Sequence, residues 1–304
     1  DKASYTDLDT LIGRLNHGGF INPQARHFLG RIRTAKHQAS KRRHIRLSHD
    51  VQDDLRLWLA FLASAGQGID MNNLTFRNPS HVSRVDACEH GIGSYSLITG
   101  KAWRFDIPVH LRLRASLNSL EHLASYIQLA FEAATTGIPP RSVILTGTDS
   151  TTAAGWLHRS SFDDSTLDAT PLRLWVARAT AKLLLDHSAV LFSKWFPGKD
   201  NQVADSLSRD SHLTNATLCP LLNSLFPEQM PQGFEICPLP RKLSFQIMMW
   251  LRRLPPTSQS PKAPTRSGIA TSITIPPSSS DTVSTKNVDA PLGRNRSFYR
   301  GSSQ

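Results

Sequence analysis

The stretch from Trp195 to Arg209 constrains the fold of this chain more than any other. It reads WFPGKDNQVADSLSR, and the apolar run that leads into it, Ala189 to Phe196, predicts a strand. A Pro-Gly turn follows, and Asp200 or Asn201 then offers a side-chain oxygen that would cap a new helix. Asp205 lies four or five residues farther along. The pattern therefore predicts a strand, a turn and a helix that carries one acidic residue.

The charges are distributed unevenly along the chain. The 304 residues include 35 Lys and Arg against 24 Asp and Glu, a net charge of +11, which favours a polyanionic partner. Residues 1–85 carry 13 basic and 7 acidic side chains, residues 86–210 carry 12 and 13, and residues 211–304 carry 10 and 4. A carboxylate-rich centre between basic segments suits a metal site surrounded by phosphate contacts. Solvated basic flanks without a partner are an equal alternative.

Cysteine content and hydropathy indicate an intracellular protein, in the cytoplasm, the nucleus or both. Cys88, Cys219 and Cys237 are too few and too scattered for a disulfide framework or a zinc site. No apolar run approaches the roughly 18 residues that span a bilayer, so no membrane partner is expected. The sequence has no signal peptide and begins at Asp1 rather than Met, which predicts a fragment of a longer chain.

The order of predicted elements indicates an α/β fold with a mixed sheet and helices on both faces. We expect strands at 81–88, 94–98, 102–107, 142–146 and 189–196, with a glycine bend at 91–93, and helices at 116–134, 151–158, 171–186 and around Asp205. We divide the chain into a helical leader (1–78), this α/β domain (79–215), an extension (216–253) and a tail (254–304). The tail is rich in Pro, Ser and Thr and is predicted to be disordered.

The leader is predicted to be a small helical region. A first helix is expected to break at residues 16–19, and a second has Pro23 near its first turn. A third helix, residues 50–65, is expected to face inward with a stripe of apolar residues: Val51, Leu55, Trp58, Leu59 and Leu62. This leader lacks the paired metal-binding aspartates that a polymerase needs.

Four acidic residues in the domain occupy predicted strand ends or helix starts: Asp86, Glu121, Asp149 and Asp205. Each has an ordinary alternative role. Asp86 is a possible turn former, and Asp149 a possible helix cap before Ser-Thr-Thr. Glu121 stands three residues after Asn118, which is a capping-box spacing. Asp205 is a possible solvated acid in a first helical turn.

Four motifs together resemble the ribonuclease H domain of retroelement reverse transcriptases. The last motif of that family is similar to PGKDN-x-x-AD-x-LSR, and RVDACEHGIGSY, LNSLEHLASY and VILTGTDSTTAA are similar to the three that precede it. Cys88 departs from the serine that is common at its position. The leader segment LIGRLNHGGFINPQARHFLGRIR resembles the region after the polymerase palm in DIRS-type elements. We therefore interpret the chain as part of a DIRS/gypsy-like polyprotein.

The resemblance implies a ribonuclease H-like fold and hydrolysis of the RNA strand of RNA–DNA hybrids. It implies that Asp86, Glu121, Asp149 and Asp205 hold two Mg²⁺ ions, with Mn²⁺ as a substitute. Two-metal hydrolysis of a phosphodiester needs ions roughly 3.5–4 Å apart, held by hard oxygen ligands. The partners that it implies are the hybrid and the polymerase portion of the same polyprotein.

Basic and aromatic residues near these motifs are candidates for nucleic-acid contact. The candidate phosphate contacts are Lys41, Arg42, Arg43, Lys194, Lys199 and Arg209. Trp103 and Trp195 could stack on bases, but core packing is the stronger expectation for both. Two other functions stay open: an inactive ribonuclease H-like module that only positions nucleic acid, and an integrase- or transposase-like strand-transfer enzyme. The sequence contains no recombinase motif.

Overall fold

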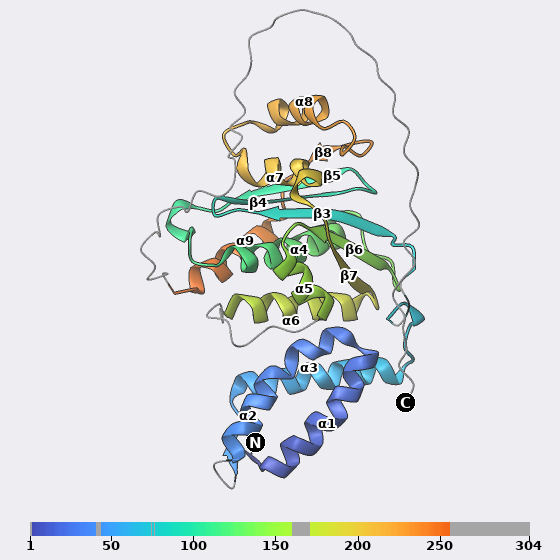
Figure 1. Cartoon of the computed structure of the whole chain (residues 1–304), viewed down its shortest axis with the longest axis vertical. Helices are drawn as coiled ribbons and strands as arrows, with labels where there is room; N and C mark the ends of the chain where they lie inside the picture. Colours follow the sequence, from blue (N-terminus) through green and yellow to red (C-terminus); the bar gives the residue numbers. More distant parts are fainter. Residues whose placement is uncertain (1, 41–43, 74, 76, 160–170, 256–304) are drawn as a thin grey trace, which may run out of the picture. The chain divides into compact units, whose positions relative to one another are not determined.

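A mixed six-stranded sheet lies at the centre of the computed structural model (Figure 1). Its strands are β3 (His81–Ala87), β4 (Gly91–Ser96), β5 (Lys101–Asp106), β6 (Val143–Thr148), β7 (Val190–Trp195) and β8 (Glu235–Ile236), in the order β7-β6-β3-β4-β5-β8. β3, β4 and β5 are antiparallel neighbours, whereas β6 runs parallel to β3 and β7 runs parallel to β6. The structure describes residues 2–40, 44–73, 75, 77–159 and 171–255.

Helices cover both faces of this sheet (Figure 1). One face carries α4 (Leu117–Thr135), α5 (Thr151–Arg159), α6 (Pro171–Asp186) and α9 (Arg241–Arg253), and the other carries α7 (Gln202–Arg209) and α8 (Asn215–Leu225). An antiparallel three-stranded meander, extended by two parallel strands and covered by helices, is the arrangement expected of a ribonuclease H-like fold. The predicted fold class is confirmed.

The buried sequences of β3 and β6 explain why both strands lie in the middle of the sheet. β6 reads VILTGT and is buried along most of its length, as is typical of a parallel strand covered on both faces. β3 is bonded on one side to β6 and on the other to β4. Since β3 and β6 are parallel neighbours, the residues at their carboxyl ends meet at the same edge of the sheet.

The glycine bend predicted at residues 91–93 is wrong, because β4 begins at Gly91. A Cβ atom on Gly93 would lie 2.5 Å from the Cβ of Leu207 and 2.7 Å from the backbone nitrogen of Ser208. A Cβ on Gly91 would overlap the carbonyl oxygen of Ser208. The glycines are therefore explained by the close approach of α7 to β4 rather than by a turn.

The leader is helical, as predicted, but its helices end at other residues. It contains α1 (Tyr5–Ile21), the 3₁₀ helix η1 (Pro23–Phe28), α2 (Gly30–Ser40) and α3 (His49–Gly66), with a short antiparallel pair of β1 (Lys2–Ala3) and β2 (Ile45–Arg46). The break expected at 16–19 is wrong, because α1 continues through it to Ile21. A Cβ on Gly18 would lie 3.2 Å from the Trp58 ring, so this glycine allows close helix packing.

The inward face of α3 also differs from the prediction. Leu59 and Leu62 are 66% and 47% exposed. The buried face instead consists of Val51, Asp54, Trp58 and Phe61. The carboxylate of Asp54 lies on this face because Arg31 of α2 and Arg178 of α6 both donate to it, at 2.7 Å and 3.0 Å. A charged residue thus occupies a position in the stripe that the sequence pattern assigned to apolar residues.

The segment 216–253, predicted only as an extension, contributes α9 to the main core. Leu243, Ile247 and Leu251 of α9 pack in the same cluster as Trp103 and Leu123. The short 3₁₀ helices η2 (Met71–Asn73), η3 (Val109–Leu111) and η4 (Gly198–Asp200) complete the described elements. The domain boundaries stay predictions, and residues 256–304 of the predicted tail lie outside the described residues. No helix in the described ranges is long and apolar enough to cross a membrane.

Candidate metal centre

Three of the four predicted acids come together at one edge of the sheet. Asp86 is the penultimate residue of β3, Asp149 directly follows β6, and Glu121 projects from the second turn of α4. One carboxylate oxygen of each residue lies within 4.8 Å of the others. The parallel pairing of β3 and β6 brings the two aspartates to this edge, and the start of α4 brings the glutamate.

Asp86 is buried, with 2% of its surface exposed, and is held by a residue of α7. The hydroxyl of Ser208 donates to its Oδ2 at 2.5 Å. Burial, together with the negative charges of Asp205 and Asp149, raises the pKa of Asp86 to about 7 against the opposing effect of the Ser208 hydrogen bond. Near neutral pH, this carboxyl is thus poorly stabilised as an anion by the protein alone.

Glu121 is held by two donors rather than by its own helix. The backbone nitrogen of Ala87 donates to Oε1 at 3.1 Å, and the Thr148 hydroxyl donates to Oε2 at 3.0 Å. Burial, followed by the charges of Asp86 and Asp149, raises the pKa of Glu121 to about 9. The capping-box alternative is wrong, because α4 is capped by Ser116.

Asp149 is only partly buried and is not the cap of α5. The Ser150 hydroxyl accepts from the backbone nitrogen of Ala153 at 3.1 Å, which makes Ser150 the capping residue. Burial is the main cause that raises the pKa of Asp149, and the charge of Asp205 adds to it. The indole nitrogen of Trp195 donates to the Asp149 carbonyl at 2.9 Å, and Trp195 is 49% exposed. Core packing, correctly expected for Trp103, is therefore wrong for Trp195.

Asp205, the fourth predicted acid, lies near this cluster but is paired with a cation. Its Oδ1 is 2.5 Å from Nε of Arg209, one helical turn farther along α7. The two side chains are 44% and 54% exposed. The charge of Asp205 raises the pKa values of Asp86 and Asp149, because like charges repel one another.

The chemistry of this cluster fits a divalent cation. Its donor atoms are carboxylate oxygens, which are the ligands that Mg²⁺ and Mn²⁺ prefer. The charges of Asp86 and Asp149 raise the pKa of Glu121, and the charge of Asp149 raises that of Asp86, so these anions repel one another in a buried setting. A bound cation would remove that repulsion. Asp86, Glu121 and Asp149 are therefore the residues that could hold a metal ion, with Asp205 beside them.

Comparison with solved structures gives a weak likeness to one ribonuclease. The chain is similar to the crystal structure of RNase H1 from the halophilic archaeon Halobacterium salinarum NRC-1, with 17% identity and a TM-score of 0.34. The match covers 43% of this chain and 96% of that chain. No family model and no curated protein matches the sequence. The fold assignment therefore rests on the strand order and not on this likeness.

Three polar residues support the cluster in roles that were not predicted from the sequence. Asp200 or Asn201 was expected to cap α7 with its side chain, but Asn201 makes no such hydrogen bond. Its amide nitrogen instead donates to the carbonyl of Val85 at 3.0 Å, one residue before Asp86. Ser208 and Thr148 hold the carboxylates of Asp86 and Glu121. The sequence contains one signal for two of these residues: a hydroxyl side chain stands close to a motif acid, with Thr148 next to Asp149 in TGTD and Ser208 three residues after Asp205 in DSLSR.

The candidate phosphate contacts fall into three groups. Lys41, Arg42 and Arg43 lie outside the described residues. Lys194 and Lys199 are exposed at the end of β7 and in η4, close in sequence to the turn beside Asp149. Arg209 is exposed but paired with Asp205. Their contact with nucleic acid stays a prediction.

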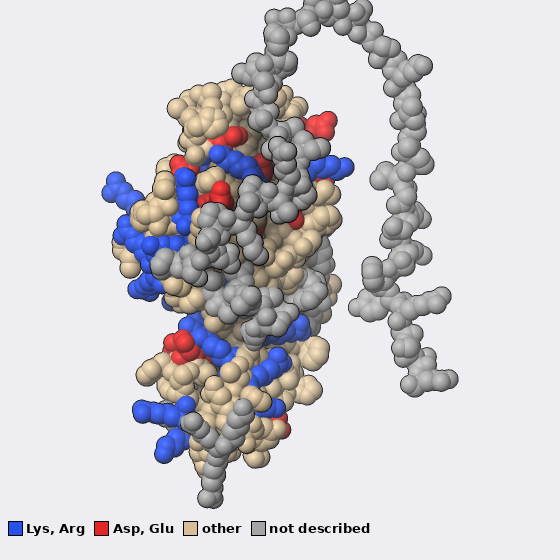
Figure 2. Space-filling model, turned by 60° about the vertical axis from the view of Figure 1, so that its left-hand side comes forward, with Lys and Arg blue, Asp and Glu red and all other residues tan. Residues whose placement is uncertain are grey.

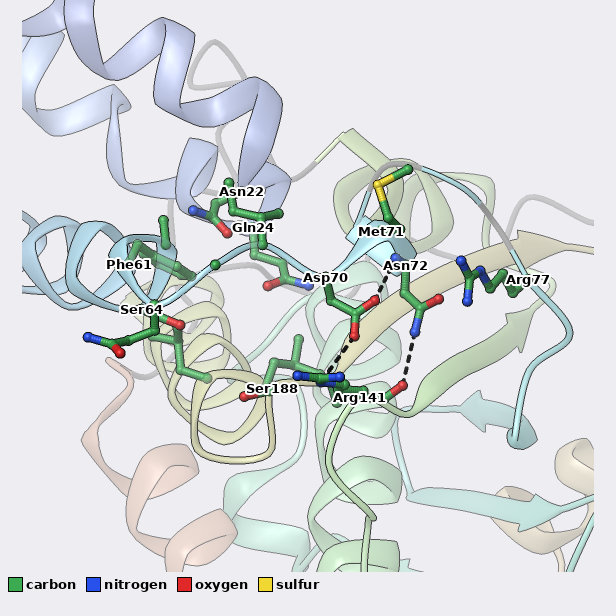
Figure 3. A pocket seen from close by; sticks show the side chains of 17 residues that line it. Asn22, Gln24, Phe61, Ser64, Asp70, Met71, Asn72, Arg77, Arg141 and Ser188 are labelled. Atoms are coloured by element: carbon green, nitrogen blue, oxygen red, sulfur yellow. Dashed lines mark hydrogen bonds and ion pairs between the residues drawn. The ribbon is translucent and has the colours of Figure 1, made fainter.

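A polar hollow of about 720 Å³ lies at the opposite edge of the sheet, where β6 begins (Figure 3). Arg141 lines it, and its Nε lies 3.7 Å from Oδ2 of Asp70. The side-chain amide of Asn72 donates to the carbonyl of Arg141 at 3.0 Å. None of the four predicted acids lines this hollow. Asp70 and Asn72 use their side chains to connect the segment after α3 to Arg141 in the loop before β6. These residues are not part of the metal centre.

Proposed function

We propose that this chain hydrolyses the RNA strand of RNA–DNA hybrids at a two-metal centre. Asp86, Glu121, Asp149 and Asp205 would hold two Mg²⁺ ions, and Mn²⁺ would substitute for them. The observation that carries the proposal is the convergence of three carboxylates within 4.8 Å at the edge where β3 and β6 end. Such a cluster, in a sheet of this strand order, matches the need for oxygen ligands from separate elements.

The chain's part in this chemistry is to hold the ligand oxygens in place. Bound divalent ions supply an activated water and stabilise the departing oxygen, which leaves a 3′-hydroxyl and a 5′-phosphate. Ser208 fixes the orientation of Asp86, and two donors fix that of Glu121. Asp149 is less enclosed than either, so it is the ligand best placed to face the substrate.

Asp205 would be free to hold a metal ion in this proposal once Arg209 left it. An ion pair that is about half exposed contributes only about 0–1 kcal/mol, so opening it costs little. The freed guanidinium then becomes available to a substrate phosphate. The pair seen in the structure is therefore compatible with both roles that the sequence motif implies.

The polyprotein context belongs to the same proposal. The motif at 195–209 and the leader segment at 11–33 support a ribonuclease H region of a DIRS/gypsy-like retroelement reverse transcriptase. In that context the leader would connect this region to a polymerase portion, which would be its covalent partner. The support comes from the residues of these motifs alone.

Cleavage of a labelled RNA–DNA hybrid by the full chain tests the function. We expect cleavage of the RNA strand with Mg²⁺ or Mn²⁺, and a loss of at least about 100-fold in Asp149→Asn. Single-stranded RNA and duplex DNA of the same sequence are the substrate controls. The melting temperature with and without metal shows whether each protein is folded and binds the ion.

Two other results of this cleavage experiment would favour the two alternative functions. A folded chain that binds the hybrid and does not cut it, with either metal, contradicts the proposal and favours an inactive positioning module. Cutting or joining of duplex DNA favours a strand-transfer enzyme.

A further inference from the structure

Four arginines lie in two distant segments of the chain that contact each other, and we call these four residues the arginine patch. Arg112 and Arg114 come from the loop between β5 and α4, and Arg252 and Arg253 end α9. The guanidinium of Arg114 joins the segments, because its Nη1 donates to the carbonyls of Arg252 and Leu254 at 3.2 Å and 3.1 Å. Figure 2 shows Lys and Arg side chains gathered on part of one face, with few Asp and Glu among them.

The arginine patch lies at the same edge of the sheet as the metal centre. Arg114 is two residues before Ser116, the cap of α4, and the second turn of this helix carries Glu121. The Asn118 side chain in the first turn accepts from the Ser150 hydroxyl at 3.4 Å, next to Asp149. From Arg114 to Glu121 the chain makes three non-helical steps of at most about 3.6 Å and four helical steps of about 1.5 Å, so the patch begins within roughly 17 Å of Glu121.

The positive charge of the patch is not neutralised by the described part of the chain. No ion pair among the described residues joins any of its four arginines to a carboxylate. Arg112 donates to the carbonyl of Ile107, and Arg114 donates only to carbonyls. Arg252 and Arg253 are exposed. In contrast, Arg31 and Arg178 have acidic partners.

We infer that the arginine patch binds the phosphate backbone of the nucleic-acid substrate beside the metal centre. The inference rests on the proposed function for the identity of that substrate. A duplex presents one phosphate charge per roughly 1.7 Å of its axis, so a surface within roughly 17 Å meets phosphates within one helical turn of the cleaved bond. The extension after residue 215, through α9, thereby adds a substrate contact to the sheet.

Two arginines in the last turn of a helix also have a plain structural role. They face the negative end of the helix dipole and stabilise the helix. That role alone predicts a lower melting temperature on neutralisation and no change in how binding depends on salt. Phosphate contact predicts a smaller salt dependence, because fewer counterions are released.

Salt-dependent binding of an RNA–DNA hybrid distinguishes these roles. Fluorescence anisotropy is measured between about 50 and 200 mM KCl with EDTA, which prevents cleavage. We expect Arg252→Gln with Arg253→Gln to reduce the slope of log K against log[KCl] by about 0.9 for each phosphate that the protein no longer neutralises, and so by up to about 1.8. Arg252→Lys with Arg253→Lys keeps both charges and should keep most of the slope.

The matched control is Arg241→Gln with Lys242→Gln, which removes the same charge from the other end of α9. These residues are exposed and lie about 18 Å from the patch along the helix. We expect the control to leave the slope within about 0.3 of the parent value. An unchanged slope in the Arg252/Arg253 variant, or an equal reduction in the control, would overturn the inference.

This test separates the patch from the proposed hydrolysis. A reduced slope in a protein that does not cut the hybrid supports the patch and contradicts the proposed function. Cleavage by the parent, with an unchanged slope in the Arg252/Arg253 variant, supports the function and contradicts the patch.

Discussion

Glu132 is a buried carboxyl on α4, three turns beyond the metal centre, and it belongs to a polar network inside the core. The amide nitrogen of Gln128 donates to its Oε1 at 2.7 Å. The amide oxygen of Gln128 accepts from the Ser94 hydroxyl and the Trp103 indole, at 2.8 Å and 2.7 Å. Burial raises the pKa of Glu132, opposed by the Gln128 hydrogen bond. The protein therefore favours the neutral form of this side chain.

We expect Glu132→Gln to stabilise the protein at neutral pH. Below the ordinary glutamate pKa of 4.5, the folded and unfolded states both keep the proton, so Glu132 has no pH-dependent cost. As the pH rises above 4.5, the unfolded state loses the proton more readily, and stability falls until the pH passes the folded pKa. Glutamine stays neutral and can keep the hydrogen bond to Gln128.

Melting temperatures at pH 4 and pH 7.5, in EDTA, check this prediction. The variant should melt higher than the parent at pH 7.5, and the difference should shrink at pH 4. An equal difference at both values would show that folding does not raise the pKa of Glu132.

Single residues were predictable where local sequence determines their position. Asp86 and Asp149 follow strand-forming runs, so the edge at which they meet could be inferred from the order of the elements. Asn201 and Ser208 were not predictable in the same way, because their partners are 116 and 122 residues away. A local pattern indicates a cap or a solvated hydroxyl at such positions.

At the scale of the elements, the packing of α7 on β4 determines where Ser208 and Asp205 lie. We expect Gly93→Ala to reduce the free energy of unfolding by about 2–3 kcal/mol, since its Cβ would overlap the backbone of Leu207 and Ser208. The displaced helix should also weaken the melting-temperature increase produced by Mg²⁺ or Mn²⁺, because Ser208 holds Asp86. Urea unfolding with and without metal measures both effects.

Gly13→Ala is the control for this substitution. Gly13 is exposed within α1, and a Cβ there meets no atom within 4 Å. Alanine should therefore increase the free energy of unfolding by about 0–1 kcal/mol. If Gly93→Ala proves as harmless as Gly13→Ala, α7 is not tightly packed on β4.

The ends of helices and strands were hardest to predict at glycines, because a glycine can mark a turn or can allow a close approach of two elements. The sequence pattern predicts a break at residues 16–19 and a bend at residues 91–93. Both segments lie inside regular elements, because the glycines there allow Trp58 and α7 to approach closely. The sequence shows that a side chain is missing at these positions, but not which neighbour requires it.

At the scale of the molecule, one buried carboxylate connects the leader to the α/β domain. Asp54 has no exposed surface, and it accepts from Arg31 of the leader and from Arg178 of α6. Ala177 and Ala181 of α6 pack in the same cluster as the leader side chains. The sequence pattern could not reveal this connection, because Asp54 in isolation is an ordinary polar residue of an amphipathic helix. The leader and the domain are consequently expected to unfold together.

Asp54→Asn tests that coupling. The substitution removes the buried anion that two arginine side chains, each about a quarter exposed, share, and leaves them only the exposed carboxylate of Asp50. We expect a loss of about 3 kcal/mol in the free energy of unfolding, in a single transition. Amide hydrogen exchange should become faster in α3 and in β6 by the same factor. Arg56→Gln is the control, since its exposed pair with Asp53 contributes only about 0–1 kcal/mol. Faster exchange in α3 alone would mean that the leader unfolds separately, and that the ion pair only attaches it to the domain.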